Sequence, residues 1–310
     1  MMKYVFAFLL LLNFGINSAQ ENQAVGEEVS IPPLVEGELL VPKSTEKVPL
    51  VILIGGSGPV DRNGNQMMAK NNSLKYLAVE LFGKGIATFR YDKRLVKIMK
   101  MGAIDEKKIR FDHFVDDAIA IIEHFKDDTR FSKIVIAGHS QGSLVGMIAA
   151  QDSVAGYISI AGAGQEIDDV IVDQLEKQAP GLKDNARQSF DDLRVNGTAQ
   201  NYSQGLASIF RPAIQPFILN WMEYNPAIEI AKLEIPVLII NGDKDLQVDI
   251  SEAKLLHQAK PDADLVIIEN MNHIFKEITG DDLENQKSYN ETNRPVIPEL
   301  IDVISTFVLK

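Results

Sequence analysis

One short motif constrains the fold of this chain more than any other feature. Residues 138–142 read Gly-His-Ser-Gln-Gly, which is the pattern Gly-x-Ser-x-Gly. A β-branched run at residues 132–137 precedes the motif, and a helical pattern of small and apolar residues follows it at 143–150. Glycines without Cβ atoms let a strand and the next helix approach closely around a tight turn. The sequence therefore predicts a strand, a sharp turn centred on Ser140 and a helix, in that order.

The serine at the centre of this turn is a candidate nucleophile. In such a strand–turn–helix unit the serine hydroxyl is held out at the top of a sheet, above a helix N-terminus. The alternative interpretation is a glycine-rich turn whose serine only caps the helix. A catalytic role for Ser140 therefore depends on whether the rest of the chain supplies a base, an acid and an oxyanion hole.

Strand and helix patterns alternate along most of the chain. Further apolar strands are predicted at residues 37–42, 49–54, 85–91, 155–160, 235–240 and 264–268. Amphipathic helices are predicted at residues 73–82, 111–125 and 298–308, with another one around Leu255. This alternation predicts an α/β fold in which a mostly parallel central sheet is flanked by helices.

One segment, residues 165–225, interrupts the alternation because it contains no convincing strand. Its helical patterns cover residues 167–178, 185–195 and 206–224. We therefore predict a helical insertion between two core strands. The predicted core consists of residues 20–164 and 226–310.

The first residues have the pattern of a secretory signal peptide. Lys3 is followed by an apolar run at residues 4–12 and by a more polar tail that ends at Ala19. A run of this length is too short to span a bilayer as a helix. We expect residues 1–19 to be removed, no stable membrane anchor, and a periplasmic or secreted protein; an uncleaved anchor or an N-terminal core helix is the alternative. Residues 20–33 are polar and are expected to be loosely held.

Composition excludes several classes of partner and chemistry. The formal net charge is −12 and no basic stripe occurs, which argues against nucleic acid and anionic membrane surfaces. The chain has no cysteine and none of the common zinc or calcium motifs, so neither a metal nor a cofactor is expected. The glycine-rich residues 55–59 lack the Lys-Ser/Thr ending of a phosphate-binding loop, which argues against a nucleotide ligand. The sequence does not indicate an oligomeric state.

A serine hydroxyl is a weak nucleophile and needs a base, which in turn needs an acid to orient it. Among the histidines, His139 precedes Ser140 and is expected to point away from it, whereas His273 follows the last predicted strand. Ligands of open α/β sheets bind beyond the carboxyl ends of strands, so His273 is the candidate base. Asp243 and Asp245 follow the preceding strand, and Asp245 is the preferred candidate acid. The alternative interpretations are that His273 is a solvated loop residue and that the two aspartates are turn carboxylates without a catalytic role.

Two backbone N–H groups are needed to stabilise an oxyanion. Gln141 is expected to supply one, because it follows the serine at a helix N-terminus. Ser57 is expected to supply the other, because it lies in the glycine-rich loop after the strand predicted at 49–54. The alternative for that loop is a simple turn.

These motifs resemble the α/β-hydrolase superfamily, and more closely its bacterial esterase and serine-aminopeptidase-like branch. The resemblance covers residues 37–308 and is carried by residues 56–65, 90–94, 138–142, 242–248 and 272–275. It implies that Ser140, Asp245 and His273 act as nucleophile, acid and base, in the chain order of that fold. It also implies that residues 165–225 form a lid. The chain departs from such proteins at Leu95, where a glycine is usual.

The first functional hypothesis is a serine hydrolase that cleaves small carboxylic esters through an acyl-enzyme on Ser140. Aromatic residues of the insertion are candidates for lining the substrate pocket: Phe210, Phe217, Trp221 and Tyr224. Ordinary packing within the insertion is the alternative for each of them.

Two other hypotheses remain open. An aminopeptidase or acyl-peptide hydrolase would use the same three residues on a short peptide, and an aminopeptidase needs carboxylates for the substrate ammonium group. The candidate carboxylates are Glu166, Asp168, Asp169 and Glu223. The third hypothesis is a binding protein on a hydrolase scaffold without catalysis.

Overall fold

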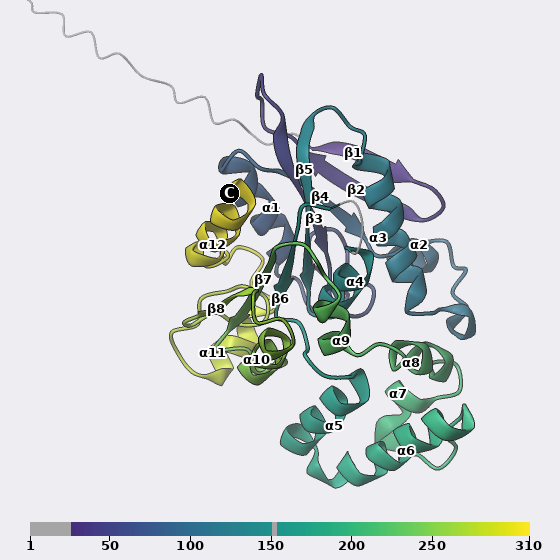
Figure 1. Cartoon of the computed structure of the whole chain (residues 1–310). Helices are drawn as coiled ribbons and strands as arrows, with labels where there is room; N and C mark the ends of the chain where they lie inside the picture. The colour runs from purple at the N-terminus through teal and green to yellow at the C-terminus, as the bar shows by residue number, and fades with distance from the viewer. Residues whose placement is uncertain (1–25, 151–153) are drawn as a thin grey trace, which may run out of the picture.

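A single eight-stranded sheet forms the centre of the fold (Figure 1). The computed structural model describes residues 26–150 and 154–310, so the predicted signal peptide lies outside the described residues. The strands are β1 (Glu27–Ile31), β2 (Val35–Leu40), β3 (Val48–Ile54), β4 (Ala87–Asp92), β5 (Phe131–His139), β6 (Gly156–Ile160), β7 (Val237–Gly242) and β8 (Asp264–Ile268). Their order across the sheet is β1-β2-β4-β3-β5-β6-β7-β8.

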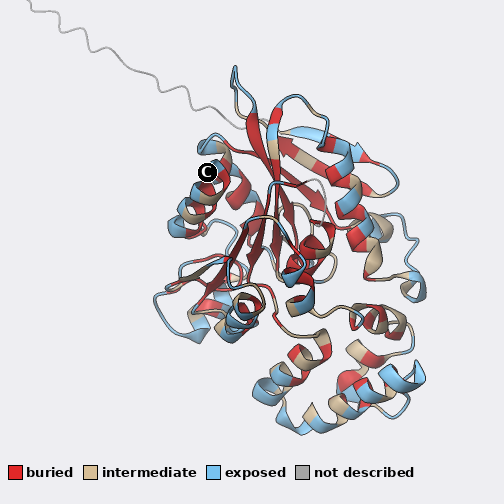
Figure 2. Ribbon diagram, viewed as in Figure 1, coloured by how far each residue is buried: buried red, intermediate tan, exposed pale blue. Residues whose placement is uncertain are grey.

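The sheet is parallel from β4 to β8, and only the β1–β2 and β2–β4 pairs are antiparallel. Every residue of β3, β4, β6 and β7 is buried, as expected for strands that are covered on both faces. Figure 2 shows the sheet as the buried interior of the molecule. The predicted α/β fold with a mostly parallel sheet is confirmed.

The prediction that residues 20–33 are loosely held is wrong for β1. This edge strand pairs with β2 in register, with Ile31 opposite Val35. Val29 and Ile31 are buried while their neighbours Glu28 and Ser30 are exposed. The alternation of two apolar residues between polar ones was the signal for a half-buried strand.

Helices cover both faces of the sheet (Figure 1). Helices α1 (Ser73–Gly83) and α12 (Pro298–Leu309) pack on one face, against Val51 and Leu53 of β3. Helices α3 (Asp112–Phe125), α4 (Gln141–Ala149), α9 (Pro226–Ala231) and α10 (Ile250–Ala259) pack on the other, against Leu50 and Ile52. Alternate side chains of one strand therefore serve two cores.

Three short α-helices of the described residues had no predicted counterpart: α2 (Arg94–Lys100) after β4, α9 before β7 and α11 (Asp282–Ser288) after β8. No residue of α2 is fully buried, and only Leu95 packs against the core cluster, so this short helix contributes little to the core. Within residues 26–150 and 154–310, no helix combines the length and apolar character needed to cross a membrane.

The segment 165–225 is helical, as predicted, and its helices gather beyond one end of the sheet (Figure 1). It contains α5 (Ile167–Gln178), α6 (Lys183–Asn196), α7 (Ala207–Phe210) and α8 (Gln215–Trp221). It has a small core of its own that includes Phe190, Leu193 and Phe210. The division into a core domain and a lid remains a prediction.

The helix predicted at 206–224 is broken into α7 and α8. Arg211 precedes Pro212 and has an extended conformation, with φ −57° and ψ 143°, because the proline ring disfavours helical geometry in the residue before it. The Gln215 side chain then donates to the carbonyl of Phe210 at the end of α7. Proline and the glutamine bond together explain the break.

We predict that Ile121→Ala lowers the free energy of unfolding by about 2–5 kcal/mol, because it leaves a cavity in the core. Ile121 and Ile119 lie on the same helix α3, but Ile121 is completely buried and Ile119 is 44% exposed. Ile119→Ala is the matched control and should change stability by less than about 0.5 kcal/mol. Urea unfolding measures both, and equal effects would contradict the packing of α3 on the sheet.

Candidate active site

Ser140 occupies a strained turn between β5 and α4. Its backbone has φ 54° and ψ −121°, a combination that a residue with a side chain rarely adopts. The Ser140 N–H donates to the carbonyl of Ile160 on the neighbouring strand β6, at 2.9 Å, and the Ser140 carbonyl accepts from Ser143 N–H, at 2.9 Å. Strand and helix thus hold the strained residue from both sides.

The two motif glycines are needed for close approach rather than for a positive φ. A Cβ at Gly138 would overlap the backbone of Gly142, and one at Gly142 would lie 2.5 Å from the carbonyl oxygen of Ile54 on β3. Helix α4 therefore sits directly against the ends of β5 and β3. The predicted strand–turn–helix unit is confirmed, and this contact is its physical basis.

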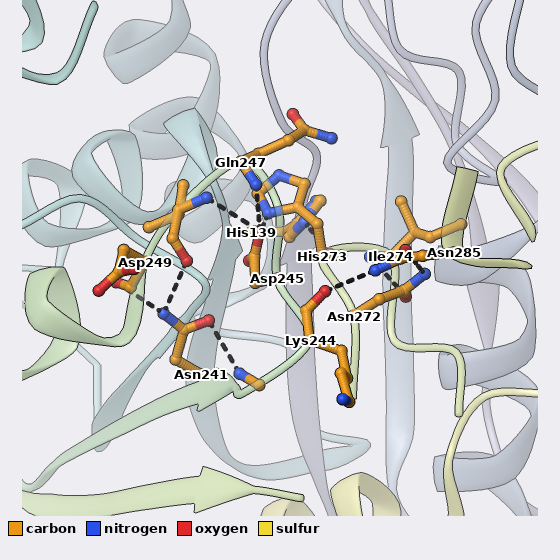
Figure 3. Close-up of polar contacts among 12 residues, drawn as sticks. His139, Asn241, Lys244, Asp245, Gln247, Asp249, Asn272, His273, Ile274 and Asn285 are labelled. Atoms are coloured by element: carbon orange, nitrogen blue, oxygen red, sulfur yellow. Dashed lines mark hydrogen bonds and ion pairs between the residues drawn. The ribbon is translucent and has the colours of Figure 1, made fainter. Parts of the chain in front are cut away.

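The structure brings Asp245 and His273 together. Asp245 Oδ2 lies 2.7 Å from His273 Nδ1, and the two side chains are 1% and 4% exposed. The other oxygen, Oδ1, accepts from the backbone N–H groups of Gln247 (2.7 Å) and Val248 (2.9 Å) (Figure 3). Because these bonds fix one oxygen in the turn after β7, the second oxygen is aimed at the imidazole.

The loop after β8 positions His273. The Asn272 side-chain carbonyl accepts from Ile274 N–H (3.2 Å) and Lys276 N–H (2.9 Å), which closes a tight turn around the histidine. The Asn272 amide nitrogen donates to Asn285 Oδ1, at 2.9 Å, and so connects the loop to helix α11 (Figure 3). Asn272 was not singled out from the sequence, although an asparagine beside a candidate base is a typical turn residue.

Asp243 lies elsewhere. Its Oδ1 accepts from the backbone N–H of Asn270, at 2.7 Å, and the residue is exposed. The structure therefore places Asp245, and not Asp243, against His273.

His139 is close to the site, which the sequence did not predict. Its Nε2 donates to the backbone carbonyl of His273 at 2.8 Å, and the two rings are 4.7 Å apart. Burial lowers the pKa of His139 well below its usual value, so the ring is neutral at physiological pH. His139 thus holds the loop that carries His273 and lines a cavity together with Ser140.

The loop after β3 runs beside Ser140. A Cβ at Gly56 would lie 3.3 Å from Ser140 Cβ, and Ser57 lines the same cavities as Ser140. Gln141 is the first residue of α4, so its N–H has no carbonyl one turn earlier in the helix to bond. Both predicted oxyanion residues therefore adjoin the serine.

Two cavities meet at Ser140. One has a volume of about 290 Å³ and is bounded by α4, α5 and α8; its apolar lining residues include Leu144, Ile167, Val170, Ile171, Trp221 and Pro226. The other has a volume of about 250 Å³ and reaches His273; its polar lining residues include Gln66, Asn71, Ser73, Gln247 and Tyr289. The serine thus separates a mainly apolar space from one with a mixed polar and apolar lining.

Of the four aromatic residues predicted to line a pocket, only Trp221 lines the cavities beside Ser140. Phe210 is buried in the core of the helical segment, where its ring is 4.6 Å from that of Phe190. Phe217 packs edge-on against Phe114 and Trp221. The Tyr224 hydroxyl donates to Asp112 at 2.7 Å. Packing between helices therefore uses three of these rings.

The carboxylates that were candidates for binding an ammonium group are paired elsewhere. Asp168 accepts from Arg187 (2.9 Å) and Arg194 (2.8 Å), Asp169 from Arg187 (2.6 Å), and Glu166 from Arg194 (2.9 Å). Glu223 accepts from Asn220 at 3.3 Å. None of the four lines the cavities at Ser140. The described residues also contain no group of three or more histidine, aspartate or glutamate side chains placed to hold a metal ion.

We predict that Gly138→Ala destabilises the protein by more than about 3 kcal/mol, because the new methyl group overlaps the backbone of α4. Gly83, at the end of α1, is the control, since a Cβ there meets nothing within 4 Å. Gly83→Ala should be neutral or slightly stabilising. Thermal and urea unfolding measure both variants, and a well-folded Gly138→Ala protein would contradict the described contact.

The chain is similar to known proteins in sequence and in fold. No protein-family model matches the chain. Esterase EstD from Thermotoga maritima is 26% identical over 285 residues, and the matched region spans 88% of this chain but only 65% of that protein.

Solved structures show the same fold at low identity. Est1E from Butyrivibrio proteoclasticus superimposes with a TM-score of 0.58 at 18% identity, over 92% of this chain and 97% of that one. The Pyrococcus furiosus esterase PF2001 gives 0.54 at 14% identity, over 81% and 84%. A puromycin-hydrolysing peptidase from Mycobacterium tuberculosis gives 0.56 at 15% identity, over 92% and 40%. The chain therefore has the α/β-hydrolase fold, and the resemblance to α/β-hydrolase esterases is confirmed.

Proposed function

We propose that this protein is a serine hydrolase that cleaves small carboxylic esters through an acyl-enzyme on Ser140. The observation that carries the proposal is the 2.7 Å contact between Asp245 Oδ2 and His273 Nδ1 at a cavity that Ser140 also lines. The similarity to esterase EstD supports the hydrolase class. The strained turn at Ser140 supports the choice of nucleophile.

In the first half-reaction Ser140 Oγ attacks the ester carbonyl carbon and His273 Nε2 takes the hydroxyl proton. Asp245 accepts a hydrogen bond from Nδ1–H, which leaves Nε2 with a free lone pair and stabilises the imidazolium that forms. The carbonyl oxygen becomes an oxyanion, which accepts hydrogen bonds from the N–H groups of Ser57 and Gln141. The intermediate collapses when the imidazolium gives its proton to the departing alcohol oxygen.

In the second half-reaction water replaces the alcohol. His273 removes a proton from the water as it attacks the acyl-serine carbonyl, and the same two N–H groups stabilise the second oxyanion. Collapse of this intermediate returns the proton from His273 to Ser140 Oγ and releases the carboxylic acid. All three side chains are then in their starting state.

The two cavities have different parts in this reaction. The leaving oxygen must reach His273 to receive its proton, so the alcohol part belongs in the 250 Å³ cavity of mixed lining that His273 borders. The acyl chain belongs in the 290 Å³ cavity on the other side of Ser140, where the lining is mainly apolar. Short to medium acyl esters of small alcohols fit this arrangement.

The contacts favour an esterase over an aminopeptidase. A free ammonium group needs an unpaired carboxylate, and the four acidic candidates accept hydrogen bonds from side chains and do not line the cavities. A binding protein without catalysis has no need for the strain at Ser140, which costs about 1–3 kcal/mol. Faster cleavage of aminoacyl p-nitroanilides than of esters would favour the aminopeptidase.

We predict that Ser140→Ala lowers kcat on p-nitrophenyl butyrate by at least about 10³-fold and that Asp245→Asn lowers it by about 10⁴-fold, because the imidazole then takes the wrong tautomer. Asp243→Asn is the control for Asp245→Asn, because Asp243 contacts Asn270 instead of His273. It should retain kcat within about twofold. Equal rates for wild type and Ser140→Ala would remove the proposal, and a failure of wild type to react with a fluorophosphonate at Ser140 would favour the binding protein.

We predict that Ile171→Ala shifts specificity toward longer acyl chains, because Ile171 lines the apolar cavity. The ratio of kcat/KM for p-nitrophenyl hexanoate to that for acetate should rise about tenfold, within the range expected for one or two methylene groups in an apolar pocket. Ile228→Ala is the control, since Ile228 is 58% exposed on α9. A change in alcohol preference without a change in acyl preference would reverse our assignment of the two cavities.

A further inference from the structure

A buried lysine lies next to the residues proposed to form the oxyanion hole. Lys93 follows β4 directly and is 2% exposed. Its Nζ donates to two neutral acceptors, the backbone carbonyl of Gly56 and the side-chain oxygen of Gln141, each at 2.6 Å. The amine also lies 4.2 Å from the ring centroid of Phe114.

Each acceptor is covalently tied to one of the two N–H groups that face the oxyanion in the proposed reaction. The Gly56 carbonyl and the Ser57 N–H belong to the same peptide group. In a trans peptide these two bonds point in opposite directions within one plane. A bond that holds the carbonyl on Lys93 therefore also fixes the direction of the Ser57 N–H.

Gln141 supplies the second N–H, and its side chain is held by the same amine. Lys93 thus connects the loop after β3 to the first residue of α4, two segments that are far apart in the sequence. A hydrogen bond to a carbonyl also polarises the peptide group and strengthens donation by its N–H.

Stability alone does not account for a lysine at this position. In the described part of the chain Lys93 has no salt bridge, and its neighbour Asp117 is already bound by Arg94 at 2.7 and 2.8 Å. Burial lowers the pKa of Lys93 to about 7, which reflects the cost of keeping a charged amine away from water. A buried methionine of similar length would avoid this cost.

We propose that Lys93 is a positioning residue that orients both oxyanion N–H donors by binding the Gly56 carbonyl and the Gln141 side chain. The inference rests on the proposed function, because it concerns the same reaction. It predicts an effect on the transition state, where the oxyanion exists, and little effect on binding of the ester itself.

The test is Lys93→Met, which keeps the length and apolar contacts of the side chain and removes the donors. We expect kcat on p-nitrophenyl butyrate to fall about 10- to 100-fold, somewhat less than for loss of a whole oxyanion donor, with KM within about twofold of wild type. Arg90→Met is the control, because Arg90 is a buried cationic side chain on the same strand β4. Arg90 is 2% exposed and donates to Glu38 at 2.7 Å, but it does not line the cavities at Ser140. Arg90→Met should keep kcat within about twofold.

The outcomes separate this inference from the proposed function. If Ser140→Ala abolishes turnover while Lys93→Met keeps the wild-type kcat, the inference fails and the proposed function stands. If both methionine variants lose kcat equally, or if KM rises instead, the role of Lys93 is structural and the inference also fails. If Ser140→Ala keeps the wild-type rate, both proposals fall.

A second variant covers the case in which Lys93→Met does not fold. Gln141→Leu removes one of the two acceptors and leaves the Lys93–Gly56 bond in place. It should lower kcat by about three- to tenfold at unchanged KM, a smaller effect because only one donor loses its support. An unchanged kcat in Gln141→Leu would overturn the proposal that the amine holds both donors.

Discussion

The close contact between β5, β3 and the start of α4 is the constraint on which the rest of the site depends. It exists because residues 138 and 142 have no side chains to keep the backbones apart. It holds Ser140 in a conformation that an isolated peptide would avoid, with bonds to strand β6 and to the first turn of the helix. The same contact brings the Gly56 loop to the serine, so that one packing arrangement supports the proposed nucleophile and both proposed oxyanion donors.

The remaining groups lie just after the carboxyl ends of parallel strands. Asp245 follows β7, His273 follows β8 and Lys93 follows β4, and backbone or turn hydrogen bonds hold the segment that carries each of them. For Asp245 and His273 these local bonds come from turn backbone and from Asn272, which costs less conformational freedom than positioning by long flexible side chains. The sheet therefore assembles the candidate site, while the helical segment at residues 165–225 supplies part of the lining of the apolar cavity beside Ser140.

Sequence reasoning succeeded for features that depend on residues close together in the sequence. The fold class follows from buried strands that alternate with amphipathic helices. The contact between Asp245 and His273 was expected because both residues follow strands, and their catalytic roles stay predictions. It failed at β1, where Val29 and Ile31 alternate over only five residues, and at the predicted helix 206–224, which Pro212 interrupts. It also expected Phe210, Phe217 and Tyr224 to line a pocket, whereas these side chains pack between helices or bond to Asp112. Export and the boundaries of the lid stay predictions.

By itself the sequence determined the fold class, the turn at Ser140 and the short set of candidates for base and acid. It could do so because backbone preferences and the apolar pattern of a buried strand depend on residues that are close in the sequence. Only the tertiary structure decided which aspartate faces His273, which aromatic ring borders the serine, and that Lys93 joins residues 56 and 141. These are contacts between segments separated by dozens of residues. No local pattern encodes them, since their geometry is created when the strands pair and the helices pack against the sheet.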